Sequence, residues 1–273
     1  MNAGVARSYC KGSTSRPIPH ASKVGILKAA AAITLTALAA ALAAVAPARA
    51  IVGDSSPGGA HGDETVMVLM RGPEGAGFCT GVVLSTRTIL TAAHCLRDPA
   101  DMLIHYREPN GEPVFVEATA AEPHPDYHAN AQVQRIRSID VGLIRTKTDL
   151  PKRFGSARLE DGQPPLLGAE VAVVGYGVRR EGQAKTGGDL REIRLKVSEP
   201  ASQVLLWLTP TSGTGGACSG DSGGPIYSDA GRVVALVAWT EGKIGRKCGA
   251  LTQGVLLAPL KNWIDSTVLR WLR

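Results

Sequence analysis

After residue 50, the chain alternates between short runs rich in Val, Ile and Leu and clusters of Gly, Pro and Asp. Short apolar runs bounded by turn-forming residues are typical of strands in an antiparallel sandwich or barrel. The runs are residues 65–70, 81–84, 88–91, 114–118, 141–144, 171–174, 204–208 and 233–239. Only the end differs, because apolar residues recur there at helical spacing after Pro259. The pattern predicts an all-β body closed by a C-terminal amphipathic helix.

The first fifty residues differ sharply in charge from the rest, with six Lys or Arg and no Asp or Glu. The whole chain has 30 Lys or Arg and 24 Asp or Glu, so loss of those six leaves 24 of each. The formal charge of +6 therefore belongs to the leader. Residues 51–273 have a formal charge of zero and therefore do not indicate a nucleic-acid or membrane-surface partner.

An Ala/Leu-rich apolar segment occupies residues 29–46, and Ala-Arg-Ala at 48–50 places small residues before a cut after residue 50. This arrangement is typical of a secretory signal peptide. The alternative is an uncleaved anchor, because the run approaches the ~20 residues that span a bilayer. We expect residues 1–50 to be removed, and residues 51–273 to be one domain that is secreted or periplasmic and not stably associated with the membrane.

Of the five cysteines, Cys10 lies in the leader, which leaves an even number suited to an oxidising compartment. The remaining four are Cys79, Cys95, Cys218 and Cys248. Four cysteines allow three pairings, so their number leaves the connectivity open.

The strongest local signal is Gly-Asp-Ser-Gly-Gly-Pro at residues 220–225. A serine hydroxyl is a weak nucleophile unless it lies in a rigid turn, beside a base and near amides that stabilise an oxyanion. Gly220 can adopt backbone angles that other residues avoid, so its N–H and that of Ser222 can form an oxyanion hole. The motif indicates catalysis by Ser222, although alone it also fits an ordinary Gly-rich hairpin.

Thr-Ala-Ala-His-Cys at residues 91–95 follows an apolar run, which places His94 at the end of a buried strand. A general base needs a fixed ring position, and a cross-link at Cys95 would supply that stiffness. We therefore predict that His94 is the base. The other histidines after residue 50 have no comparable context and are interpreted as structural or surface residues: His61, His105, His124 and His128.

Asp140 lies in the apolar stretch Ile-Asp-Val-Gly-Leu-Ile at residues 139–144. A buried carboxylate is costly without a partner. His94 is the natural partner, because a carboxylate would orient its imidazole and stabilise the charged form. The alternative is an ion pair with Arg137 or Arg145 at a strand edge. We predict that Asp140 completes the triad.

The order and spacing of His94, Asp140 and Ser222 resemble those of the chymotrypsin/trypsin family of serine proteases. Further similar segments are Ile-Val-Gly-Asp at 51–54, Cys-Thr-Gly at 79–81, His-Pro-Asp-Tyr at 124–127 and Gly-Tyr-Gly at 175–177. The resemblance implies two six-stranded antiparallel β-barrels with a C-terminal α-helix and the triad in the cleft between them. It also implies a serine endopeptidase, and we expect an exported bacterial member.

The resemblance also implies a cysteine pairing. Cys79 would pair with Cys95 beside the histidine, and Cys218 with Cys248 beside the substrate pocket. Free buried thiols and a different pairing are the alternatives.

In the family, a new N-terminal ammonium pairs with the aspartate that precedes the nucleophile, which implies a pair between Ile51 and Asp221 here. Because the signal-peptidase site directly precedes Ile51, we expect signal peptidase to create this N-terminus. Trimming after Arg49 by a trypsin-like enzyme is the alternative.

The family also implies the position of the pocket that receives the substrate side chain. Gly216 stands six residues before Ser222, where a trypsin-like member carries aspartate, and Ala217 follows it. We therefore expect cleavage after uncharged, small to medium apolar residues. The opposite wall would include Ala238, Trp239, Thr240 and Gly254. Thr240 stands where a wide pocket has glycine, so we expect a shallow pocket.

No cofactor is expected, and no metal site, because the acidic residues within 107–122 match no calcium-binding spacing. Expected partners are protein or peptide substrates, with protein inhibitors as further candidates. A protease-fold binding protein without catalysis is the main alternative, disfavoured because all three triad residues and both oxyanion-hole residues are present. A lipase or esterase would instead carry Gly-x-Ser-x-Gly with histidine last in the chain.

Overall fold

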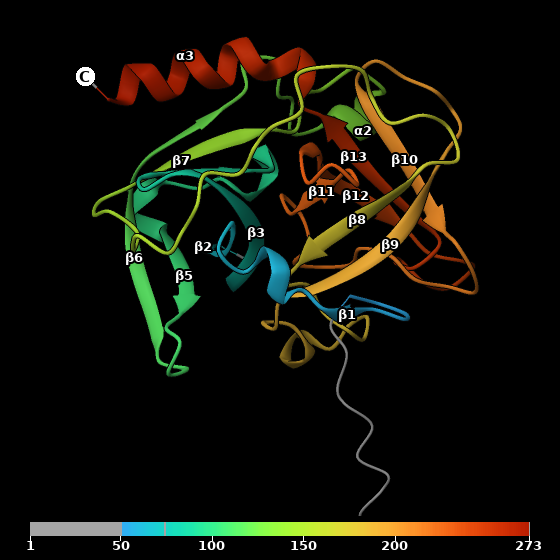
Figure 1. Cartoon of the computed structure of the whole chain (residues 1–273), viewed down its shortest axis with the longest axis horizontal. Coiled ribbons are helices and arrows are strands. Elements are labelled where there is room, and N and C mark those ends of the chain that lie inside the picture. The colour runs from blue at the N-terminus through green and yellow to red at the C-terminus, as the bar shows by residue number, and fades with distance from the viewer. Residues whose placement is uncertain (1–50, 74, 273) are drawn as a thin grey trace, which may run out of the picture. The chain divides into compact units, whose positions relative to one another are not determined.

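The computed structural model describes residues 51–73 and 75–272 (Figure 1). The predicted signal peptide, residues 1–50, lies outside the described residues, as do Cys10 and the predicted cleavage site. Within the described residues, no helix is long and apolar enough to cross a membrane.

The first barrel closes six antiparallel strands in the order β2-β3-β4-β7-β6-β5. Their bounds are β2 Thr65–Gly72, β3 Gly75–Ser85, β4 Thr88–Thr91, β5 Met102–Arg107, β6 Pro113–Pro123 and β7 Gly142–Thr146. Val68, Ile89 and Ile104 are fully buried in its interior. Closure pairs the outermost strands and so leaves no sheet edge in the barrel.

The second barrel contains β8 Glu170–Gly175, β9 Arg191–Ser198, β10 Leu205–Pro210, β11 Pro225–Tyr227, β12 Val233–Glu241 and β13 Leu251–Leu256. The order β8-β9-β10-β13-β12-β11 closes on itself, because β8 pairs with both β9 and β11. A short strand, β1 Ser56–Pro57, pairs with the start of β9. The predicted pair of six-stranded barrels is confirmed.

The predicted C-terminal helix is α3, Lys261–Trp271, at the top of Figure 1. Its Ile264 belongs to a buried cluster that includes Leu90 and Leu143 of the first barrel and Val174 and Val255 of the second. This shared cluster joins the two barrels below the helix. The remaining helices are short: η1 Gly59–His61, η2 Ala93–Cys95, η3 Pro99–Asp101, α2 Ala131–Gln134, η4 Ala184–Thr186 and η5 Ala258–Leu260.

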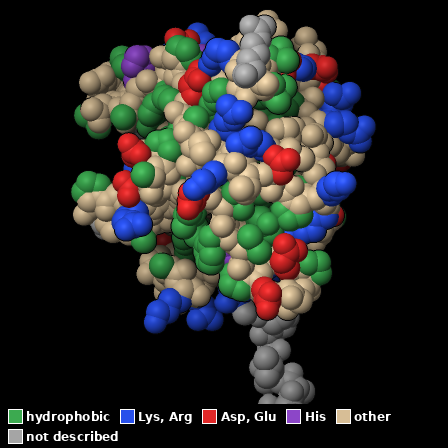
Figure 2. Space-filling model, turned by 90° about the vertical axis from the view of Figure 1, so that its left-hand side faces the viewer, with side chains coloured by type: hydrophobic (Ala, Val, Ile, Leu, Met, Phe, Trp, Pro, Cys, Tyr) green, Lys and Arg blue, Asp and Glu red, His purple; other side chains and the backbone are tan. Residues whose placement is uncertain are grey.

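Both disulfides form as predicted. Cys79 on β3 is bonded to Cys95 at the end of η2, and Cys218 is bonded to Cys248. Figure 2 views the left-hand side of Figure 1 and shows Lys and Arg interspersed with Asp and Glu on that face. This mixed surface agrees with the equal numbers of acidic and basic residues after residue 50.

Candidate active site

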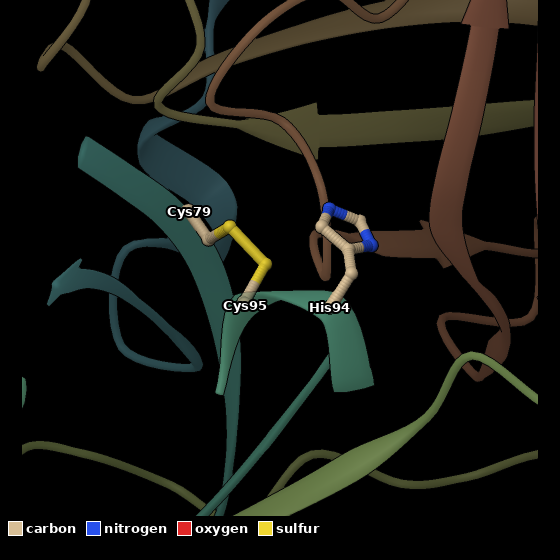
Figure 3. Close-up of side chains that lie close together, drawn as sticks. All are labelled: Cys79, His94 and Cys95. Atoms are coloured by element: carbon tan, nitrogen blue, oxygen red, sulfur yellow. A yellow bond between two sulfur atoms is a disulfide. The ribbon is translucent and has the colours of Figure 1, made fainter. Parts of the chain in front are cut away.

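His94 lies in η2, immediately after β4, whose four residues are all buried. Figure 3 shows the His94 ring beside the Cys79–Cys95 disulfide, and His94 and Cys95 project from the same short turn. Possible ligand atoms of these three residues lie within 4.8 Å of one another, but both sulfurs are consumed by the disulfide. The disulfide therefore stiffens the turn that carries His94, and its two sulfurs are not available as metal ligands.

Asp140 holds His94 at two points. Its Oδ2 lies 2.6 Å from His94 Nδ1, and its Oδ1 accepts a hydrogen bond from the His94 backbone N–H at 2.8 Å. Because a carboxylate only accepts, Nδ1 carries the proton and Nε2 is left as the acceptor. Within residues 51–73 and 75–272, neither Arg137 nor Arg145 pairs with Asp140.

Ser222 comes from the second barrel, in the loop before β11, and lies against the histidine turn. Its carbonyl oxygen accepts a hydrogen bond from Thr80 N at 2.9 Å and lies 3.9 Å from Cys95 Sγ. In the described part of the chain, no hydrogen bond joins Ser222 Oγ to the His94 ring. Catalytic hydrogen bonds are often long without substrate and tighten in the Michaelis complex.

The backbone N–H groups of Gly220 and Ser222 donate no hydrogen bond to any described residue. They are therefore available to a carbonyl oxygen, as an oxyanion hole requires. Gly220 has φ +96°, and an added Cβ would lie 2.2 Å from Cε2 of Phe78. Only glycine fits at this position.

The Asp221 side chain points inward and is fully buried. Its two oxygens accept hydrogen bonds of 2.8 Å from the backbone N–H groups of Gly177 and Cys218. Burial raises the pKa of Asp221 to about 7, against the lowering effect of these two donors. Among the described residues, no Lys, Arg or His pairs with this carboxylate.

The segment that begins at Ile51 is packed beside this loop. Ile51 is fully buried, and the Val52 carbonyl accepts a hydrogen bond from Gly216 N at 2.9 Å. The start of the predicted mature chain therefore contacts the strand-like segment that leads to Asp221.

The predicted pocket residues differ in their placement. Ala217 is buried and Gly216 lies beside Thr252, whose Oγ1 would be 2.8 Å from a Cβ added at Gly216. The same Oγ1 accepts a hydrogen bond from Ala217 N at 3.0 Å. Thr252 was not predicted as a site residue, because its contact with Gly216 joins segments far apart in the chain.

The opposite wall lies on β12, where Ala238 forms a bulge before Trp239, which is 36% exposed. Thr240 on β12 is paired with Thr252 on β13, so their side chains share a face. The structure corrects the expectation for Gly254. Where its side chain would lie, Ile226 Cδ1 stands at 2.5 Å inside the barrel. Thr252, and not Gly254, therefore faces Gly216.

Comparison with known proteins agrees with this geometry. The model of the trypsin family matches residues 51–264. The chain belongs to the trypsin family. It is 26% identical to trypsin alpha of Drosophila melanogaster over 71% of this chain and 78% of that protein. It is 28% identical to kallikrein 1-related peptidase b11 of Mus musculus over 71% of this chain and 81% of that protein.

Among solved structures, the chain is similar to neuropsin, a serine protease expressed in the limbic system of mouse brain. The TM-score is 0.60 at 20% identity, over 74% of this chain and 93% of neuropsin. This likeness supports the two-barrel fold of a trypsin-family protein.

The contact between the serine loop and the first barrel leaves no room for a side chain at Gly223. This residue has φ +77°, and an added Cβ would lie 2.5 Å from Thr80 O and 2.6 Å from Ala92 N. We predict that Gly223→Ala lowers the free energy of unfolding by about 3 kcal/mol or more, because backbone must move. Urea denaturation measures this loss.

Gly231→Ala is the matched control, because Gly231 has φ +68° and open space where a Cβ would lie. The Gly231→Ala variant has the strain of a positive φ without the collision, so its free energy of unfolding should fall by only about 1–2 kcal/mol. Equal losses in the two variants would contradict the predicted tight contact.

Proposed function

We propose that this chain is an exported serine endopeptidase with His94, Asp140 and Ser222 as its catalytic triad. The observation that carries the proposal is the 2.6 Å pairing of His94 Nδ1 with Asp140, beside a serine loop with two uncommitted amides. Membership of the trypsin family supports action on protein or peptide substrates. The apolar leader before Ile51 supports export.

In the proposed reaction, Ser222 Oγ attacks the carbonyl carbon of the cleaved bond while its proton passes to His94 Nε2. Asp140 stabilises the imidazolium and keeps its own charge. The N–H groups of Gly220 and Ser222 stabilise the oxyanion. His94 then gives its proton to the leaving amine, which breaks the peptide bond and leaves an acyl group on Ser222. Water, deprotonated by His94, then attacks the acyl carbon. The bond from that carbon to Ser222 Oγ breaks, His94 returns its proton to Oγ, and the carboxylic acid leaves.

The pocket favours an uncharged side chain before the cleaved bond. Gly216, Ala217 and Thr252 contribute no charge, and Thr252 reduces the space beside Gly216. Thr240 shares a face with Thr252 and narrows the same region. Small to medium apolar residues therefore suit the site best.

Activation would follow from the new N-terminus. Cleavage after Ala50 frees an ammonium on Ile51, and the buried Asp221 carboxylate is the anion for it to pair with. The hydrogen bond between Gly216 N and Val52 O supports this docking, because it fixes the segment close to the Asp221 loop. A paired Asp221 would hold the peptides of the oxyanion hole in place.

Digestion of a diverse peptide mixture tests the function, with protein that begins at Ile51 and products identified by mass spectrometry. We expect cuts after small or medium apolar residues that are absent with Ser222→Ala. A serine-directed phosphonate should label Ser222 in the same preparation. Cuts after Lys or Arg that are absent with Ser222→Ala would contradict the pocket assignment and leave the protease proposal intact. Absence of both cutting and labelling would favour a binding protein that retains the protease fold.

The size of the pocket depends on Thr252. We predict that Thr252→Gly raises kcat/KM for substrates with a large apolar residue, relative to those with Ala, by about tenfold or more. Thr252→Val is the control, because it keeps the volume and loses only the acceptor for Ala217 N. Paired peptide substrates measure the ratio. A similar shift in both variants would show that volume does not set the preference.

The pairing of Ile51 with Asp221 predicts a difference in pH dependence between two forms of the protein. In a form extended before Ile51, Asp221 has a pKa of about 7 when folded and 3.8 when unfolded. The folded state then binds more protons between these values, so its free energy of unfolding falls as pH rises. In protein that begins at Ile51, the ammonium lowers the pKa of Asp221 and removes this loss.

Urea denaturation at about pH 4.5 and about pH 7.5 measures the free energy of unfolding of both forms. The advantage of the Ile51 form over the extended form should be about 2–4 kcal/mol larger at the higher pH. Asp221→Asn in both forms is the control and should abolish the difference. Parallel pH profiles of the two unsubstituted forms would refute the pairing.

A further inference from the structure

Thr80 on β3 of the first barrel contacts the serine loop of the second barrel through both its backbone and its side chain. It is fully buried and follows Cys79 directly. Its N–H donates to the Ser222 carbonyl at 2.9 Å, and its Oγ1 lies 2.8 Å from the Gly220 carbonyl. Its own carbonyl accepts a hydrogen bond from Thr91 Oγ1 at 2.8 Å. One buried residue therefore holds two carbonyls of the loop that carries the nucleophile.

The direction of the side-chain hydrogen bond follows from its partners. Tyr176 N lies 3.0 Å from Thr80 Oγ1, and a backbone N–H can only donate. Oγ1 is therefore the acceptor for Tyr176 and directs its single proton to the Gly220 carbonyl. Both hydrogen-bonding roles of the hydroxyl are used, so its orientation is fixed.

The peptide unit between Gly220 and Asp221 is consequently held at both ends. Its carbonyl accepts from Thr80 Oγ1, and its N–H donates to the Cys218 carbonyl at 3.0 Å. A peptide unit is planar, so two such contacts fix the plane. This unit lies between the two peptide units that carry the N–H groups of Gly220 and Ser222. Its plane therefore sets the directions of both oxyanion-hole donors.

We propose that Thr80 is a positioning residue for the oxyanion hole. Its hydroxyl aligns the Gly220 and Ser222 N–H groups, and its N–H holds the Ser222 carbonyl, from a strand that the disulfide links to the His94 turn. This assignment rests on the proposed protease function. Thr80 touches no reacting atom and acts through the loop.

The assignment has a kinetic consequence. The oxyanion is present in the transition state and absent from bound substrate, so misaligned donors weaken transition-state stabilisation more than substrate binding. Loss of the Thr80 hydroxyl should lower kcat and leave KM nearly unchanged. A general loss of structure would instead reduce the number of active sites.

The test compares Thr80→Val, which keeps the volume and removes the hydroxyl, with Thr80→Ser, which keeps the hydroxyl. Both variants begin at Ile51 and are assayed with a chromogenic peptide that the wild-type protein cleaves. Titration with a serine-directed phosphonate counts active sites. Affinity for a peptide aldehyde of the same sequence reports on the oxyanion hole, because its adduct with Ser222 carries the tetrahedral oxygen.

The matched control is Thr146→Val. Thr146 is also fully buried and donates to a carbonyl, that of Thr148 at 2.9 Å, but it lies at the end of β7 away from the serine loop. It reports the effect of losing a buried threonine hydroxyl from the same barrel.

We expect Thr80→Val to lower kcat per active site by about tenfold or more, with KM within about threefold and a parallel loss of aldehyde affinity. Thr80→Ser should restore most of kcat, and Thr146→Val should leave it unchanged. Wild-type kcat and aldehyde affinity in folded Thr80→Val would overturn the assignment. If that variant does not fold, Thr80→Ala gives the same comparison without methyl groups pressed on the Gly220 carbonyl.

A folded Thr80→Ser variant with kcat as low as Thr80→Val would also overturn the assignment, because the hydroxyl would then not be the active group. If the wild-type protein itself shows no activity that depends on Ser222, the proposed function fails and the assignment fails with it. The two failures are therefore distinguishable.

Discussion

The hydrogen bond from Thr80 N to the Ser222 carbonyl joins the two barrels at the point where the chemistry is proposed. His94 and Asp140 belong to the first barrel and Ser222 to the second, and each barrel has its own buried core. A small rotation between the barrels would therefore separate the nucleophile from its base. Close backbone contact at this junction, and the apolar cluster beneath α3, restrain that rotation.

The same junction explains why its glycines are needed. Gly175 and Gly177 flank the Asp221 carboxylate, and a Cβ at either position would lie within 2.3 Å of a carboxylate oxygen. Gly223 meets backbone of the first barrel in the same way. Close packing leaves buried polar groups no access to water, so each needs a partner in the protein. The hydrogen bonds of Thr80 and Asp221 meet this requirement and at the same time fix the loop.

The sequence pattern predicts the all-β body and the closing helix well, and each of the eight predicted runs falls within or overlaps a strand. The arrangement as two barrels came from the family resemblance. Five strands were missed, for identifiable reasons. In β9, Ile193, Leu195 and Val197 face inward and alternate with polar residues, so the strand lacks the continuous apolar run by which the other strands were predicted. β1 and β11 are only two and three residues long. β5 and β13 mix polar residues into short apolar segments.

The triad residues could be proposed from sequence because each lies in a local motif. Thr80 and Thr252 could not, because their roles depend on contacts between segments far apart in the chain. Thr80 meets Gly220 across 140 residues. Thr252 and Gly254 are two residues apart on β13, so their side-chain positions lie on the same face of the strand. Which of the two residues meets Gly216 depends on the point along β13 at which the segment before Ser222 packs against it, and the sequence of β13 alone does not give that point. The family resemblance implied Gly254, whereas the structure places Thr252 Oγ1 beside Gly216.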